Sequence, residues 1–157
     1  MSAHKPLEGV KVVELASFVA APTAGRMMAE MGADVIRVES TAGDPWRFYG
    51  ANCGLPITDE ENPLFDIYNL GKKDIQLNTK TPEGKEILFH LLDEADVFIT
   101  NNRLKSLVRS GLDYESLKDR FPKLIYGLVT GYGQTGPDVD APGYDGVAFF
   151  SRSGMLA

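Results

Sequence analysis

Short runs of apolar and β-branched residues recur along the chain, separated by segments in which apolar residues follow helical spacing. The runs predict five short strands, over residues 10–15, 34–38, 75–77, 97–100 and 124–129. The spacing between them predicts helices over residues 22–31, after Pro82, after Arg103 and over residues 114–120. Because strands alternate with helices, the pattern favours an α/β fold with a doubly wound, mostly parallel sheet.

The ends of several predicted helices carry capping residues. Thr81 precedes Pro82 and Glu83, which places an N-cap hydroxyl, a proline and an acid in the order that starts a helix. The next helix is expected to stop at Gly111, since glycine accepts the left-handed conformation that ends many helices. Asp113 is expected to cap the helix that follows.

The first two predicted strands and the helix between them form a βαβ unit. Its turn, ASFVAAPTAG, lacks the G-x-G-x-x-G spacing that lets a pyrophosphate approach the backbone, so a dinucleotide site is disfavoured. Glu39 ends the second strand, where a ribose-binding acid would lie. A solvated strand end is the favoured interpretation of Glu39.

Residues 40–63 show no periodicity and are expected to form a long loop. They include Trp46, Arg47, Phe48 and Tyr49. Loops of this length in compact domains are usually functional or interfacial, so these side chains are candidates for packing on a substrate or on a partner chain. A loop held in place by its own aromatic residues is an equally weighted alternative.

A glycine-rich loop follows the last predicted strand. It carries glycines at positions 131, 133, 136 and 143 and leads to Tyr144 and Asp145. Ligands of open α/β sheets bind outside the carboxyl ends of the strands, so we expect this loop to line a site in which Tyr144 and Asp145 are the reactive side chains. Residues 147–150 are expected to form the first turns of a helix that packs back onto the sheet.

Composition narrows the class of protein. The 157 residues are 43% hydrophobic and carry a formal net charge of −6, which favours one globular domain and argues against a sequence-independent nucleic-acid binder. Cys53 is the single cysteine, which fits a reducing compartment, and no apolar run approaches membrane-spanning length. We expect a cytoplasmic protein that binds neither nucleic acid nor membrane.

Few residues offer catalytic or metal chemistry outside the glycine-rich loop. His4 and His90 have no partners at triad or ligand spacing, and Cys53 has no evident basic neighbour, so neither a metal site nor a thiolate nucleophile is expected. A basic set in the middle of the chain would suit a polyanionic ligand: Lys72, Lys73, Lys80, Arg103, Lys105 and Arg109. An ordinary solvated basic face explains the same set equally well.

Several motifs resemble those of family III CoA-transferases. They are GYGQTGP followed by PGYD, the opening LEGVKVVELASFVAAPTAGRMMAEMGADVIRVES, the segment NLGKKDIQLNTKTPEGKEIL and the segment ADVFITNNR. AGDP, TDEEN and GYDGVAFFSRSG are similar to the clostridial enzymes that act on phenyllactate and 2-hydroxyisocaproate. The resemblance implies a large Rossmann-like, CoA-binding domain, with residues 1–157 as its N-terminal part and a second domain absent from this chain. Because SGMLA stops inside an apolar helical pattern, we expect a truncated chain and a sheet incomplete at its C-terminal end.

The resemblance also implies which residues hold CoA, the substrate of this family. The positions that match its CoA contacts are Phe18, Val19, Leu77, Lys80, Asn101 and Arg109, whereas Tyr144 and Asp145 match residues beside the reaction centre. Asn102 and Pro142 depart from formyl-CoA transferase, which has an aromatic residue and a lysine there. The resemblance implies no permanently bound cofactor, and it implies an interlaced homodimer.

The reaction implied by the resemblance is covalent. An aspartate attacks the acyl-CoA carbonyl, a mixed anhydride forms and CoA thiolate leaves; exchange of the acid then gives an aspartyl-CoA thioester and finally the new acyl-CoA. The matching nucleophile follows a further loop beyond Ala157, so Asp145 is assigned a supporting role. The implied substrates are an acyl-CoA and a small carboxylic acid of the 2-hydroxy class.

Two alternatives are weighed against the transferase. α-Methylacyl-CoA racemases resemble this family, but they have a proton-moving histidine where this chain has Tyr144. Tyrosine, with a reference pKa of about 10, is a poor base at neutral pH, so the transferase is favoured. The other alternative is a non-catalytic fragment that binds CoA or associates with another chain.

Overall fold

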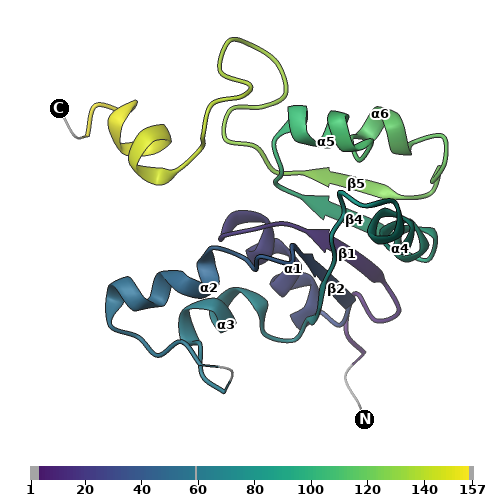
Figure 1. The fold of residues 1–157 in the computed structure, drawn as a ribbon, viewed down its shortest axis with the longest axis horizontal. Helices are drawn as coiled ribbons and strands as arrows, with labels where there is room; N and C mark the ends of the chain where they lie inside the picture. The colour runs from purple at the N-terminus through teal and green to yellow at the C-terminus, as the bar shows by residue number, and fades with distance from the viewer. Residues whose placement is uncertain (1–3, 59, 156–157) are drawn as a thin grey trace.

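Five parallel strands form the centre of the molecule (Figure 1). The computed structural model describes residues 4–58 and 60–155. In it the strands lie in the order β3-β2-β1-β4-β5. Their bounds are Lys11–Leu15 for β1, Asp34–Glu39 for β2, Lys73–Gln76 for β3, Val97–Thr100 for β4 and Ile125–Leu128 for β5. Each lies within two residues of the boundaries predicted from hydrophobic patterning, which confirms the parallel α/β fold.

The strand order reverses between β1 and β4. Lys11 of β1 is in register with Asp34 of β2, and Val12 of β1 is in register with Val97 of β4. The chain runs outward from β1 through β2 to β3, and the connection after β3 returns past β1 to β4 on its other side. In a doubly wound sheet such a reversal opens a crevice at the carboxyl ends of the strands, and that crevice is where ligands bind.

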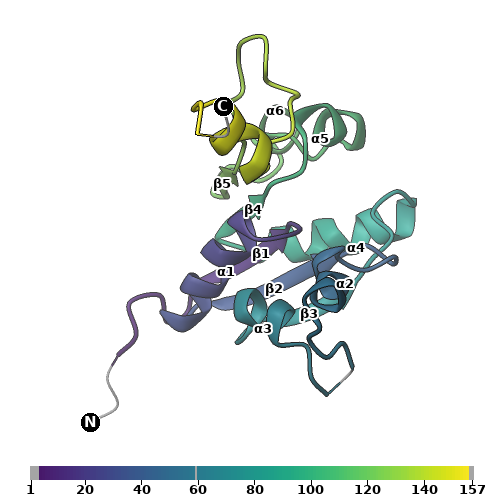
Figure 2. The same ribbon diagram turned by 90° about the vertical axis from the view of Figure 1, so that its left-hand side faces the viewer.

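Helices cover both faces of the sheet, as a doubly wound fold requires. On one face α1 (Ala20–Glu30) buries Ala21 against a cluster that includes Val12, Val35 and Ile99. On the other face a larger cluster joins the sheet to α4 (Pro82–Asp93), α5 (Leu104–Ser110) and α6 (Tyr114–Leu117). Figure 2 shows β5 with α5 and α6 at one end of the sheet, and β3 with α2 and α3 at the other.

Helix α1 packs over the Glu14 side chain of the sheet with a glycine. It begins at Ala20, two residues before the predicted start, and Val19 is its N-cap. Gly25 faces the sheet, and a Cβ atom there would lie 1.8 Å from Oε2 of Glu14 in β1. Glycine at this position therefore leaves room for a charged side chain between helix and sheet.

The capping predictions are confirmed for two helices and wrong in detail for a third. The Thr81 hydroxyl accepts a hydrogen bond from the Gly84 amide at 3.2 Å, and Gly111 ends α5 with a left-handed φ of 67°. Asp113 is the N-cap of α6, but its carboxylate accepts the Ser116 hydroxyl instead of a backbone amide. Helix α6 ends at Leu117, three residues before the predicted end.

Residues 40–63 are not a structureless loop, which corrects the prediction. They contain α2 (Trp46–Tyr49) and a 3₁₀ turn (Gly50–Cys53) and lead into α3 (Pro63–Asn69), which was not predicted. Asn62 caps α3 by accepting the Phe65 amide at 3.3 Å, and Pro63 occupies the first helical position. Elements of four to seven residues are too short to show helical periodicity, although N-P is a helix-start signal.

The segment Gly146–Ser151 is a π-helical turn. The prediction that it packs back onto the sheet is wrong. Figure 1 shows this segment, in yellow, standing apart from the sheet. Val147, Phe149 and Phe150 are 49%, 56% and 41% exposed. The glycine-rich loop before the segment carries it away from the strands, so these apolar side chains stay largely open to solvent. Among the described helices, none is long and apolar enough to cross a lipid bilayer.

Candidate functional site

The crevice between β1 and β4 is bridged by the side chain of Asn101. Its Oδ1 accepts the Ser17 amide at 3.0 Å, and its Nδ2 donates to the Ser17 carbonyl at 2.7 Å. One residue earlier, the Thr100 hydroxyl donates to the Leu15 carbonyl at 2.7 Å. Both polar ends of Asn101 are thus used to hold the turn after β1, which makes this predicted CoA contact a support for the neighbouring turn.

A cavity of about 110 Å³ lies at the carboxyl ends of β1, β2 and β3. Its lining includes Ser17 from the β1–α1 turn, Leu77 and Thr79 from the β3–α4 connection, and Asn102 after β4. The Leu77 amide donates to the Glu39 carbonyl at 2.9 Å, which fixes the start of that connection. The structure therefore places Leu77 in a hollow at the ligand-binding edge of the sheet.

The turn after β1 and the glycine-rich loop meet at an aromatic contact. The ring centroids of Phe18 and Tyr144 are 5.7 Å apart with the planes at 73°, an edge-to-face arrangement. Val19 follows as the N-cap of α1, and its carbonyl accepts the amide and hydroxyl of Thr23 at 2.8 and 2.7 Å. Three of the predicted site residues are thus brought to one place by elements from opposite ends of the chain.

Two glycines close the neck of the glycine-rich loop. A Cβ atom on either Gly131 or Gly143 would lie 2.5 Å from the Cα of the other, so only glycine allows the two backbones to approach this closely. Tyr144 follows the neck directly and is 55% exposed. Asp145 is the N-cap of the π-helical turn, and its carboxylate makes no capping hydrogen bond. The neck therefore sets where both residues stand.

Lys80 and Arg109, the two predicted phosphate contacts, have exposed side chains. Lys80 lies in the turn before α4, where its amide donates to Oδ1 of Asn78 at 3.2 Å. Arg109 lies in the last turn of α5. Neither makes an ion pair with an acidic residue in the described part of the chain, so both can accept an anionic partner.

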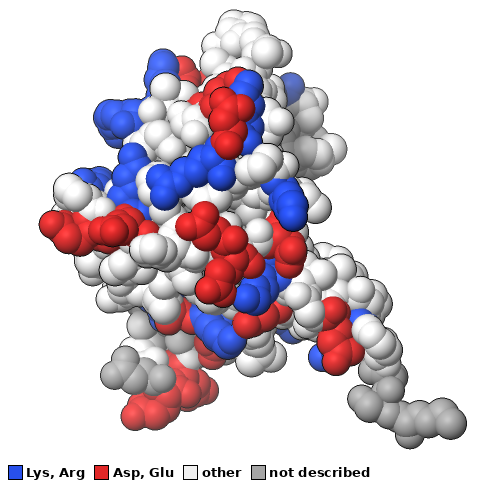
Figure 3. Space-filling model, turned by 90° about the vertical axis from the view of Figure 1, so that its right-hand side faces the viewer, with Lys and Arg blue, Asp and Glu red and all other residues white. Residues whose placement is uncertain are grey.

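The rest of the predicted basic set is largely committed elsewhere. The side chain of Lys72 is 1% exposed and pairs with Glu14 at 2.8 Å, so it is not available to a ligand. Lys73 pairs with Asp34 at the amino edge of the sheet, and Lys105 pairs with Asp140. Figure 3, which shows the side of the molecule that includes α4 and α6, has Lys and Arg side chains over its upper half with Asp and Glu among them.

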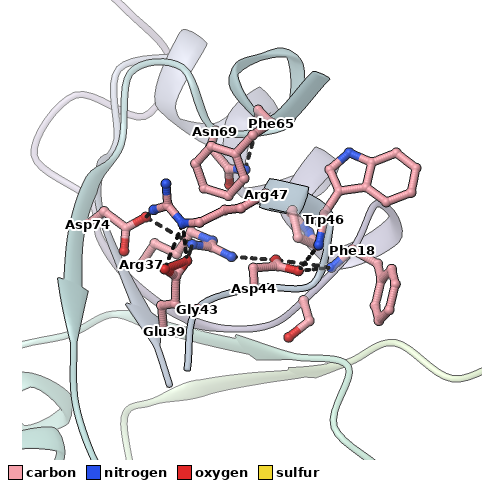
Figure 4. A network of polar contacts seen from close by, with 12 residues as sticks. Phe18, Arg37, Glu39, Gly43, Asp44, Trp46, Arg47, Phe65, Asn69 and Asp74 are labelled. Atoms are coloured by element: carbon pink, nitrogen blue, oxygen red, sulfur yellow. Dashed lines mark hydrogen bonds and ion pairs between the residues drawn. The ribbon is translucent and has the colours of Figure 1, made fainter. Parts of the chain in front are cut away.

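A buried ionic network on the α1 face of the sheet was missed by the sequence analysis (Figure 4). At its centre Arg37 of β2 is 0% exposed and pairs with Glu39 at 2.5 Å, Asp44 at 2.5 Å and Asp74 at 2.9 Å. Glu39 is 3% exposed and also accepts Arg47 Nε at 2.7 Å, so the prediction of a solvated strand end is wrong. The whole ionic network consists of four acids and three bases: Glu14, Glu39, Asp44, Asp74, Arg37, Arg47 and Lys72.

Burial shifts the protonation equilibria of several members of this network. It raises the pKa of Glu14 and of Asp74 and lowers the pKa of Lys72, in each case against the attraction of the opposite charges. Burial also acts to raise the pKa of Glu39, but hydrogen bonds from Arg47 and Arg37 outweigh it and lower that pKa. Oε1 of Glu14 and Nε of Arg37 have no hydrogen-bond partner, and they face each other at 3.5 Å.

Trp46 packs both on Tyr49 within the 40–63 segment and on aromatic residues outside it. Trp46 stacks on Tyr49 with ring centroids 4.7 Å apart, and its Nε1 donates to the Leu64 carbonyl at 3.1 Å. The Arg47 guanidinium lies 3.8 Å from the centroid of Phe65. These contacts favour a segment held in place by its own aromatics, and Trp46 also reaches Phe18 at 6.3 Å.

Within residues 4–58 and 60–155 no group of three His, Cys, Asp or Glu could hold a metal ion.

Comparison with known proteins identifies the family. The model of CoA-transferase family III matches residues 7–157. The chain is 54% identical over 147 residues to the cinnamoyl-CoA:phenyllactate CoA-transferase of Clostridium sporogenes, covering 94% of this chain and 36% of that protein. It is 47% identical to the (R)-2-hydroxy-4-methylpentanoate CoA-transferase of Clostridioides difficile, covering 95% and 37%. The chain thus spans about a third of the length of these curated relatives.

Solved structures agree with the family model. A CAIB/BAIF family protein from Brucella suis, 42% identical, superposes with a TM-score of 0.87 over 98% of this chain and 40% of that one. A hypothetical protein from Mycobacterium tuberculosis, 34% identical, gives a TM-score of 0.82 over 96% of this chain and 40% of that one. The chain belongs to CoA-transferase family III.

Proposed function

We propose that the full-length protein containing this chain transfers CoA from an acyl-CoA to a small carboxylic acid. The observation that carries the proposal is the contact between Phe18 and Tyr144, which joins the β1–α1 turn to the glycine-rich loop beside the carboxyl ends of the neighbouring strands β1 and β4. Membership of CoA-transferase family III supplies the reaction class. The arrangement supports a thioester lying across the carboxyl ends of the strands, between the turn and the loop.

In the proposed complex the exposed side chains of Lys80 and Arg109 bind the phosphates of CoA. Lys80 and Arg109 are exposed and unpaired with described acids, and phosphate groups form strong charge-assisted hydrogen bonds with such side chains. Leu77, in the cavity wall, and the Phe18–Val19 turn supply apolar surface for the pantetheine arm. Asn101 holds the Ser17 backbone through both of its polar atoms, so its contribution is to fix that turn.

The proposed reaction proceeds through two covalent intermediates on an aspartate beyond Ala157. The carboxylate attacks the thioester carbonyl, the C–S bond breaks, and a mixed anhydride and CoA thiolate result. The thiolate then attacks the aspartyl carbonyl of the anhydride and expels the first acid as its carboxylate, which leaves an aspartyl-CoA thioester. The carboxylate of the second acid attacks this thioester, which forms a new mixed anhydride and releases CoA thiolate again. The thiolate then attacks the carbonyl of the second acid in this anhydride, which gives the new acyl-CoA and releases the aspartate as a free carboxylate. Tyr144 and Asp145 would border the reacting atoms, where backbone amides of the glycine-rich loop can stabilise the oxyanions.

We further propose that the exchanged acids are 2-hydroxy acids with an aryl or branched side chain. Two relatives that are 54% and 47% identical are named for phenyllactate and for (R)-2-hydroxy-4-methylpentanoate. In this chain Phe18 lies between Trp46 and Tyr144, with centroid distances of 6.3 and 5.7 Å. Such a row of aromatic rings suits an apolar acyl side chain, because ring faces bury apolar surface well.

Assembly as a homodimer in the cytoplasm belongs to the same proposal. The exposed apolar side chains of the π-helical turn, Val147, Phe149 and Phe150, would be covered by further chain or by a second copy. Light scattering of the full-length protein across a tenfold range of concentration tests the dimer. A constant monomer mass would contradict it.

The proposed activity is tested by incubating the full-length protein with a panel of acyl-CoA donors and free acids. We expect CoA to pass between 2-hydroxy acids, with aryl or branched side chains preferred over dicarboxylic acids and formate. Inversion of the α-carbon of an acyl-CoA without exchange of the acid would instead identify a racemase. Binding of CoA without either reaction would leave a non-catalytic CoA-binding protein.

A further inference from the structure

We propose that Asp44 is a positioning residue for CoA transfer, because it holds Phe18 in a left-handed conformation at the edge of the site. The inference rests on the proposed function but concerns a residue outside the expected CoA contacts. Phe18 has a φ of 63°, the single positive φ of a non-glycine residue within residues 4–58 and 60–155. Bulky L-residues rarely adopt this conformation, so the surrounding structure must hold it.

The Asp44 carboxylate supplies that hold. Its Oδ2 accepts the Phe18 amide at 3.1 Å, and its Oδ1 lies 3.3 Å from the same nitrogen and accepts the Trp46 amide at 2.9 Å. Asp44 is 2% exposed, so these bonds are made away from water. One carboxylate thus ties the turn after β1 to the first residue of α2 (Figure 4).

Arg37 in turn fixes the orientation of Asp44. Its Nη2 donates to Oδ2 of Asp44 at 2.5 Å, while its Nη1 is bound by Glu39 and Asp74. Because the guanidinium is planar and fully buried, its partners set the direction of each N–H group. The carboxylate of Asp44 therefore has one favourable orientation, and the Phe18 amide is held in that direction.

The conformation of Phe18 decides where its ring lies. The ring contacts Trp46 on one side and Tyr144 on the other, at centroid distances of 6.3 and 5.7 Å. A return of Phe18 to an ordinary negative φ would redirect the turn and separate the ring from Tyr144. Asp44 also lines the cavity that holds Leu77, and the effect proposed for it on the site is exerted through Phe18.

The test replaces Asp44 by asparagine in the full-length protein. If the amide NH₂ group replaces Oδ2, the Phe18 amide loses its nearer acceptor and Arg37 loses its acceptor on this side chain. If it replaces Oδ1, the Trp46 amide loses its acceptor, and Phe18 is left with a neutral and therefore weaker one. We expect the KM for acyl-CoA to rise about tenfold or more, with kcat changed less than about twofold. The matched control is Asp74→Asn, which removes the charge of another partner of Arg37, leaves an oxygen that can still accept its Nη1, and does not touch the Phe18 turn. It should leave that KM unchanged.

The variant Phe18→Gly distinguishes two roles of Asp44, which are holding Phe18 in its left-handed conformation and stabilising the fold in general. Glycine adopts a positive φ freely, so adding Asp44→Asn to it should raise the KM by less than about twofold. If Asp44→Asn alone fails to fold, Phe18→Gly should restore folding to the double variant. A further tenfold rise in the double variant, a double variant that stays unfolded, or an equal effect of Asp74→Asn would overturn the inference.

Hydrogen exchange distinguishes a failure of this inference from a failure of the proposed function. The amide of Phe18 should exchange about tenfold faster or more in Asp44→Asn, and at the native rate in Asp74→Asn. This measurement needs no catalytic turnover, so it remains decisive if the unsubstituted protein transfers no CoA. An unchanged exchange rate in Asp44→Asn would show that Asp44 does not hold the turn.

Discussion

The ring of Phe18 meets the ring of Tyr144 edge to face, at a centroid distance of 5.7 Å. Phe18 follows the first strand of the sheet, and Tyr144 follows the neck of the loop after the last one. Their contact is possible because parallel strands deliver the turns that follow them to one edge of the sheet. The conformations of the turn after β1 and of the glycine-rich loop therefore determine the shape of the proposed site.

Gly143→Ala should impair the site by opening the neck of the glycine-rich loop. The new Cβ would lie 2.5 Å from the Cα of Gly131, so the backbones must separate and Tyr144 must move away from Phe18. We expect kcat/KM for acyl-CoA in the full-length protein to fall about tenfold or more. Gly146→Ala is the control, because a Cβ there meets nothing within 4 Å and the residue needs no positive φ. Equal losses of kcat/KM in the two variants would contradict the claim that the close approach of Gly131 and Gly143 positions Tyr144.

Lys80→Gln and Arg109→Gln should each weaken binding of acyl-CoA. The loss of one charge-assisted bond to a phosphate is worth about 1.5 kcal/mol or more, so the KM should rise at least about tenfold in each variant. Lys73→Gln is the matched control, because Lys73 begins β3 at the amino edge and Lys80 follows the same strand at the carboxyl edge. Native KM values for both Lys80→Gln and Arg109→Gln would remove these residues from the CoA site.

Glu14→Gln should destabilise the fold by leaving the Lys72 ammonium buried without a counter-charge. Removing one partner of a buried pair costs about 3–5 kcal/mol, and the side chain of Lys72 is 1% exposed. The double variant Glu14→Gln/Lys72→Met should lose less than the sum of the two single variants, as measured by urea unfolding. Glu94→Gln, which breaks the exposed pair with Lys11, should leave the free energy of unfolding almost unchanged. Additive losses for Glu14 and Lys72 would show that the buried pair is not coupled.

Tyr126 should make the stability fall at high pH. Burial, with a smaller contribution from the charge of Asp113, raises the pKa of Tyr126 to about 12, and its hydroxyl donates to the Leu112 carbonyl at 2.9 Å. A folded pKa above the unfolded value of about 10 gives stability that is present below pH 10 and lost as the pH rises through 12. The loss is at most about 2.7 kcal/mol, and solvent screening reduces it because Tyr126 is only half-buried.

The variant Tyr126→Phe isolates this pH effect. It lacks both the hydroxyl and its ionisation, so it should be less stable than the native protein at pH 8 by about 1 kcal/mol. Above pH 10 the difference in the free energy of unfolding should shrink, because only the native protein then loses the stability that depends on a protonated Tyr126. Urea unfolding at pH 8 and pH 11 measures both values. A difference that stays constant or widens would contradict the expected sign.

Hydrophobic patterning was sufficient to predict the sheet, because most strands contain a short apolar or alternating run between clear turn and cap signals, and the more polar β3 (KDIQ) still lies within two residues of its predicted bounds. The resemblance to the family then predicted residues that the fold brings to one edge, such as Phe18, Leu77 and Tyr144. The contact of Phe18 with Tyr144 itself could not be predicted, because it depends on the path of the glycine-rich loop in space.

The ionic network was missed for a different physical reason. Arg37 and Glu39 alternate with Ile36 and Val38 along β2, and in a half-exposed strand that alternation would point the charged side chains to water. Here both faces of the strand are covered, and Gly25 of α1 leaves space for charge beneath the helix. The Gly-Asp pair at positions 43 and 44, one short turn after β2, was the signal that could have revealed a carboxylate aimed back at Arg37.

The central claim is that CoA moves between acids through an aspartate beyond Ala157, with Asp145 in a supporting role. Hydroxylamine added during turnover of the full-length protein converts an aspartyl anhydride or thioester into a hydroxamate, which peptide mass spectrometry locates. The account predicts a modified aspartate beyond Ala157, and predicts that Asp145→Asn slows turnover while the same aspartate is still modified. A hydroxamate on Asp145, or turnover with no modified aspartate at all, would contradict it.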